Sequence, residues 1–111
     1  MRELGRHAIV DAWGAEPALL NDPGRLEDNL NEAVKLTGAT VLRSGSYQFE
    51  PQGVTVWVIL AESHATIHTY PEEGRWMADI FTCGKVKPEK AAMFLSEVLG
   101  GKSRLSVLSR G

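Results

Sequence analysis

The sequence predicts an α+β protein, a two-layer sandwich with an antiparallel sheet and two helices packed on one face. Three observations lead to this prediction. Strand-like and helix-like segments alternate in the order β-α-β-β-β-β-α-β, most links between them are of hairpin length, and apolar residues recur at helical spacing in only two segments. The chain of 111 residues suits one domain, 1–111, with a single core.

Residues 5–13, which include His-Ala-Ile-Val-Asp-Ala-Trp, predict the first strand. The first helix is expected to begin at Asp22 as N-cap, with Pro23 at the first helical position. Residues that would form the buried face of this helix recur at helical spacing, namely Leu26, Leu30, Ala33, Val34 and Thr37. Gly38 suits the end of the helix.

Four strands are expected in the middle of the chain, as two pairs. The first pair is 39–49 and 53–61, with a turn around Pro51, and the second is 65–70 and 75–82, joined by Pro-Glu-Glu-Gly. Pro88 then opens a second helix, which Gly100-Gly101 ends; the shared apolar face is Ala91, Ala92, Leu95, Val98 and Leu99. Residues 103–109 predict a last strand.

Composition excludes several classes of function. The net charge of −2 and the lack of an arginine-rich run argue against nucleic acid as a partner. A single cysteine excludes an intrachain disulfide framework, and no Cys/His group has zinc spacing, so no metal is predicted. No stretch approaches 18 consecutive apolar residues and no signal-peptide pattern is present, so we expect no membrane partner and a cytoplasmic protein.

The segment 61–72, Ala-Glu-Ser-His-Ala-Thr-Ile-His-Thr-Tyr-Pro-Glu, carries the main chemical hypothesis. The Ser63 hydroxyl can attack the preceding Glu62 carbonyl, convert the peptide to an ester and leave by β-elimination, which caps the new N-terminus with a pyruvoyl ketone. Decarboxylation of an amino acid needs an electron sink beside the α-carbon. Because the sequence has neither a Gly-rich phosphate cradle nor a lysine in an obvious Schiff-base setting, a cofactor made from the chain itself is favoured.

Several ordered landmarks resemble one family. They are Leu4-Gly5-Arg6-His7, Thr37-Gly38-Ala39-Thr40, Phe49 with Pro51 and Gly53-Val54-Thr55, Glu62-Ser63-His64 through Glu72, and Phe81-Thr82-Cys83-Gly84. Together they resemble the prokaryotic pyruvoyl-dependent S-adenosylmethionine decarboxylases of spermidine synthesis, over roughly the whole chain. The resemblance implies self-cleavage into 1–62 and 63–111, a pyruvoyl cofactor generated from Ser63, and S-adenosylmethionine as substrate.

The resemblance also implies roles for matching residues. Ser63 would become the pyruvoyl group and form a Schiff base with the substrate amine, His68 would act as the processing base, and Cys83 would return a proton to the substrate α-carbon. Thr55 stands where the family usually has serine and would steady the oxyanion of the acyl shift. Phe49 and Glu72 would bind the nucleoside, the first by stacking or by facing the sulfonium and the second through the ribose hydroxyls.

Each of these residues also has a structural interpretation, such as a core aromatic for Phe49, a buried inert thiol for Cys83 or a turn carboxylate for Glu72. His7 and His64 stay outside the predicted catalytic set. In a regular strand, Ser63 and His68 would face opposite sides about 16 Å apart. We therefore expect a sharp bend near Glu62–Ser63, and self-processing would be untenable if Ser63 lay far from both His68 and Cys83.

The family forms dimers whose pockets use residues of both protomers, so the resemblance implies a homodimer. Trp57, Trp76 and Tyr47 are candidates for the face between subunits, with burial in one protomer's core as the alternative. Two other functions remain open. One is the same chemistry on arginine or ornithine, and the other is a non-processing homologue that binds a ligand or regulates a partner.

Overall fold

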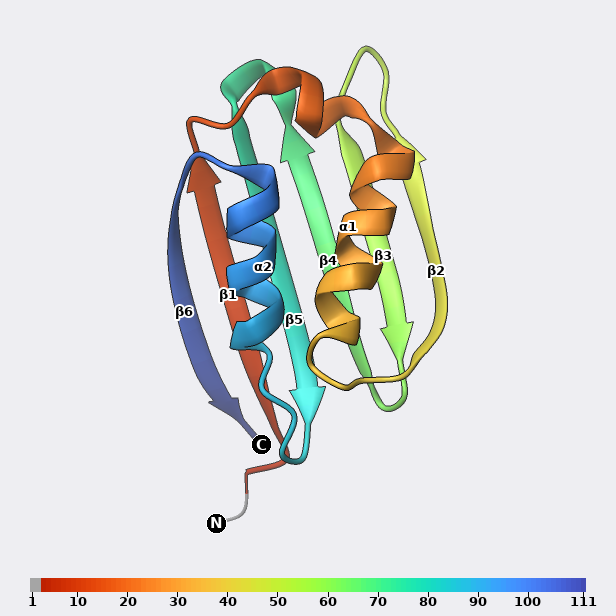
Figure 1. The fold of residues 1–111 in the computed structure, drawn as a ribbon, viewed down its shortest axis with the longest axis vertical. Coiled ribbons are helices and arrows are strands. Elements are labelled where there is room, and N and C mark those ends of the chain that lie inside the picture. Colours follow the sequence, from red (N-terminus) through yellow and green to blue (C-terminus); the bar gives the residue numbers. More distant parts are fainter. Residues whose placement is uncertain (1–2) are drawn as a thin grey trace.

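The computed structural model describes residues 3–111. It is a six-stranded antiparallel sheet with both helices on one face (Figure 1). The strands lie side by side in the order β2-β3-β4-β5-β1-β6. They are β1 (Gly5–Trp13), β2 (Val41–Gln48), β3 (Val54–Leu60), β4 (Ser63–Tyr70), β5 (Arg75–Cys83) and β6 (Lys102–Arg110). The helices are α1 (Pro23–Lys35) and α2 (Glu89–Leu99), and two short 3-10 helices are η1 (Pro17–Asn21) and η2 (Pro71–Glu73). The predicted fold class is confirmed.

The sheet buries every second residue of its central strands beneath the helices. In β4, Ala65, Ile67 and Thr69 are buried, whereas His64 and His68 are not. Because successive side chains of a strand point to opposite faces, the second set lies on the side without helices. We call this side the open face.

Both helices begin and end much as their sequences predict. The Asp22 carboxylate accepts a hydrogen bond of 3.1 Å from the backbone N–H of Arg25, which confirms the N-cap. At the other end, the Thr37 hydroxyl donates to the Val34 carbonyl at 2.6 Å. Most of the expected apolar faces are buried, namely Leu26, Leu30, Ala33 and Val34 in α1 and Ala91, Ala92, Leu95 and Leu99 in α2. Val98 is half-buried, and Thr37, also half-buried, lies beyond the end of α1.

The three aromatic residues considered for a subunit face separate into two groups. Trp76 is 0% exposed and belongs to the core, which was the alternative to a place on a subunit face. Trp57 and Tyr47 are 37% and 64% exposed and belong to the open face of β3 and β2. In residues 3–111, no helix has the length and apolar character that crossing a membrane requires.

Candidate active site

Ser63 is the first residue of β4 and follows a tight turn from β3. Leu60 pairs with Ser63 across this hairpin, so Ala61 and Glu62 form the turn. Glu62 has a φ of 60°, the left-handed region that costs a residue with a side chain about 1 kcal/mol. The backbone N–H of Cys83 donates a hydrogen bond of 3.1 Å to Ser63 Oγ. The serine hydroxyl is therefore held against the end of β5, beside a strained residue.

The other predicted processing residues gather toward the far end of β4. His68 lies directly opposite Thr55 on β3, and Thr55 Oγ1 is 2.6 Å from His68 Nδ1. The Phe49 and Tyr70 rings lie 5.7 and 4.7 Å from the His68 ring, measured between centroids. Glu72 is exposed in η2, just beyond Tyr70.

The expected approach of Ser63 and His68 within one protomer does not occur. The chain does turn sharply at Ala61–Glu62, but β4 then runs unbroken from Ser63 through His68. Ser63 and His68 therefore lie at separate places on one strand, about 16 Å apart along its length at 3.3 Å per residue. Sequence reasoning placed the bend correctly and drew the wrong consequence from it, because the bend precedes both residues rather than separating them.

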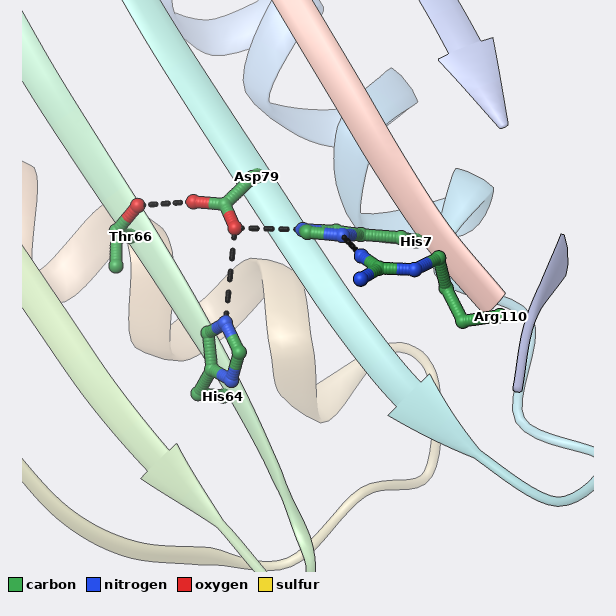
Figure 2. Close-up of polar contacts among 5 residues, drawn as sticks. All are labelled: His7, His64, Thr66, Asp79 and Arg110. Carbon is green, nitrogen blue, oxygen red and sulfur yellow. Dashed lines mark hydrogen bonds and ion pairs between the residues drawn. The ribbon is translucent and has the colours of Figure 1, made fainter. Parts of the chain in front are cut away.

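A network of polar side chains crosses four strands on the open face (Figure 2). Arg110 Nη1 of β6 is 2.8 Å from His7 Nδ1 of β1, and His7 Nε2 is 2.6 Å from Asp79 Oδ2 of β5. On β4, the Thr66 hydroxyl donates to Asp79 Oδ1, and His64 Nε2 lies 3.6 Å from Asp79 Oδ2. Asp79 is thus the common partner of three side chains.

The tautomer of His7 follows from its neighbours. Arg110 can only donate, so His7 Nδ1 must accept, and the His7 proton must sit on Nε2, where it is donated to Asp79. Ligand atoms of His7, His64 and Asp79 lie within 4.8 Å of one another, close enough to surround a cation. A metal on His7 Nε2 would displace that proton, and a metal-bound histidine normally donates from its other nitrogen, which Arg110 opposes. The donor set therefore fits a hydrogen-bonded network better than a metal centre.

Sequence reasoning missed this network. Alternation in 64–70 already puts His64 and Thr66 on one face, and alternation in 75–82 does the same for Asp79 and Phe81. The missing information is the sheet order, which places β5 between β4 and β1 and so brings His7 to Asp79.

The fold and the site together describe a small two-layer α+β protein. It carries a serine at a strained hairpin and an imidazole–hydroxyl pair further along the same strand. A family model described as S-adenosylmethionine decarboxylase matches residues 6–111, so the chain belongs to that family. The resemblance seen in the sequence is confirmed.

Individual relatives agree with the family match. A protein of Brevibacillus brevis described as S-adenosylmethionine decarboxylase proenzyme is 50% identical over 97 residues, covering 86% of this chain and 73% of that protein. One of Methanococcus maripaludis with the same description is 48% identical over 90 residues, covering 80% and 74%. The crystal structure of the adenosylmethionine decarboxylase from Aquifex aeolicus superposes with a TM-score of 0.92 at 33% identity, covering 100% of this chain and 93% of that one.

Proposed function

We propose that this chain is a self-processing S-adenosylmethionine decarboxylase that cleaves itself between Glu62 and Ser63 and then makes decarboxylated S-adenosylmethionine. Membership of the family supports the activity. The observation that carries the self-processing step is the held Ser63 hydroxyl next to the strained Glu62. Relief of that strain favours the acyl shift from nitrogen to oxygen.

The residues around Ser63 fit a pyruvoyl group made in place. Ser63 begins a strand, so cleavage before it leaves β4 paired with β5 through residues 64–70. Cys83 lies at the end of β5, where its backbone touches the serine hydroxyl, and its thiol is free. The pyruvoyl group, once formed, supplies the electron sink beside the substrate α-carbon. Cys83 would then return a proton to that carbon.

The separation of Ser63 from His68 supports catalysis shared between two protomers. A two-fold axis in the plane between two open faces, perpendicular to the strands, would reverse one β4 relative to the other and lay its end over the start of its partner. The Thr55–His68 pair of one protomer would then serve Ser63 of the other, and Phe49 and Glu72 would bind that site's nucleoside. Such isologous contacts are the usual form of homodimers. The exposed Trp57 and Tyr47 rings would be covered at the same time.

The substrate is the part of this proposal that an assay decides. Phe49 is 40% exposed and lies beside His68, where an aromatic face suits an adenine or a sulfonium. We expect carbon dioxide release from S-adenosylmethionine and none above background from arginine or ornithine. Release from either amino acid in preference to the nucleoside would overturn the substrate assignment, and release from none would favour the regulatory homologue. The cytoplasmic location stays a prediction.

A further inference from the structure

Cleavage before Ser63 removes one of the two covalent attachments that hold the start of β4 in place. In the intact chain, Ser63 is held on both sides, by the hairpin to Leu60 and by the strand that follows. Once the Glu62–Ser63 bond is broken, residue 63 becomes a chain end that strand pairing alone ties to β3 and β5, and chain ends fray unless further contacts hold them. The first side chain after the cut belongs to His64.

His64 contacts three side chains on the open face, Phe81, Asp79 and, edge to face with ring centroids 6.0 Å apart, His7. Its ring stacks on Phe81 with centroids 5.7 Å apart and an interplanar angle of 25°. Its Nε2 lies 3.6 Å from Asp79 Oδ2, an ion pair whenever the imidazole is protonated. On another side the ring borders an open hollow of about 320 Å³, so its position on this face depends on the side chains of Phe81, Asp79 and His7.

The Asp79 carboxylate is itself fixed in direction. Thr66 donates to one oxygen and His7 to the other, and Arg110 sets the His7 tautomer that makes this donation possible (Figure 2). An oriented carboxylate holds an imidazole in a defined place better than a mobile one, since less side-chain freedom is lost on contact. The network thus provides a rigid anchor across β1, β4, β5 and β6.

Phe81 connects this anchor to the predicted proton donor. Phe81 pairs with His64 across β4 and β5, and Cys83 lies two residues further along β5. Residue 63 adjoins His64 and lies against the backbone of Cys83, so a shift of β4 at His64 changes the distance between residue 63 and Cys83. Misplacement by about 1 Å costs an enzyme as much as a hundredfold in rate.

We propose that His64, clamped between Phe81 and Asp79, is a positioning residue that keeps the pyruvoyl-bearing end of β4 in register with Cys83 after self-cleavage. This inference rests on the proposed function. It assigns the His7–Asp79–Arg110 network to the mature enzyme rather than to the cleavage step. Before the cut the hairpin already holds Ser63, so the clamp matters little to cleavage.

The test compares cleavage with turnover in the same variants. His64→Ala should cleave within about threefold of the wild-type rate, whereas kcat of the cleaved enzyme should fall about tenfold to a hundredfold, with KM changed far less. His64→Phe keeps the stack and loses the ion pair, so its kcat should lie between those of wild type and His64→Ala. Asp79→Asn should lower kcat in the same direction and remains informative if His64→Ala does not fold.

A matched control is Glu89→Gln, which breaks an ion pair on the helix side of the sheet, 2.9 Å from Arg6, between α2 and β1. It should leave both rates unchanged. Wild-type kcat in cleaved His64→Ala, or a folded His64→Ala that no longer cleaves, would overturn the inference. Failure of the proposed function looks different, because the wild-type protein itself would then stay intact or release no carbon dioxide.

Discussion

Thr55 and His68 face each other across β3 and β4, with Thr55 Oγ1 2.6 Å from His68 Nδ1. This contact occupies one ring nitrogen, so in the proposed function Nε2 is the atom that would remove the α-proton of Ser63. The pair lies away from Ser63 of its own chain. The contact within the pair and the distance of the pair from Ser63 therefore lead to two separate predictions.

Removal of the Thr55 hydroxyl should slow self-cleavage. Thr55→Val keeps the branched shape and deletes the hydrogen bond, which should lower the free energy of unfolding by about 1 kcal/mol. The rate of appearance of the 63–111 chain should fall about a hundredfold, the loss typical of removing one oxyanion donor. Thr55→Ser retains the hydroxyl and should cleave at least as fast as wild type. Wild-type cleavage by a folded Thr55→Val protein would remove Thr55 from the processing machinery.

The proposed sharing of the site between protomers predicts complementation. Ser63→Ala cannot be cut and His68→Ala lacks the base, so each variant alone should stay intact. When the two are co-expressed with tags of different mass, the His68→Ala chain should be cleaved, because the Ser63→Ala partner supplies its histidine. A Ser63→Ala/His68→Ala double variant as partner is the control and should rescue nothing. An uncleaved mixture of folded chains would contradict the shared site.

The strained turn predicts an unusual effect of glycine. Glu62→Gly should relieve the left-handed conformation and stabilise the precursor by about 1 kcal/mol. If that strain is released in the acyl shift, the cleavage rate should fall about fivefold, since 1.4 kcal/mol corresponds to a factor of ten. Glu62→Ala loses the carboxylate but keeps the strain, so it should cleave like wild type. Equal rates for the glycine and alanine variants would show that strain makes no contribution.

The sequence was sufficient for the architecture because the signals there are local. Asp22 and Pro23 mark a helix start by their own chemistry, and alternation in 64–70 marks a half-buried strand. The short helix η1 was missed, since five residues carry too little periodicity to detect. Trp76 was assigned to two possible places, and only packing against α2 and the sheet decides that it belongs in the core.

The site was less predictable because it depends on which strands become neighbours. Ser63 and Cys83 are 20 positions apart and meet only because β4 pairs with β5. His7 and Asp79 are 72 positions apart and meet because β1 inserts beside β5. The separation of Ser63 and His68 in a regular strand was predictable from strand geometry, but that β4 runs uninterrupted between them came only from the structure.

An intact mass spectrum of the purified protein tests the central chemistry most directly. We predict two chains, 1–62 and 63–111, the second lighter than a serine-initiated chain by the mass of ammonia and shifted again by a carbonyl reagent such as hydroxylamine. A Ser63→Ala protein should give one uncut mass under the same conditions. One unmodified mass of the whole chain from folded wild-type protein after long incubation would contradict self-processing at Ser63.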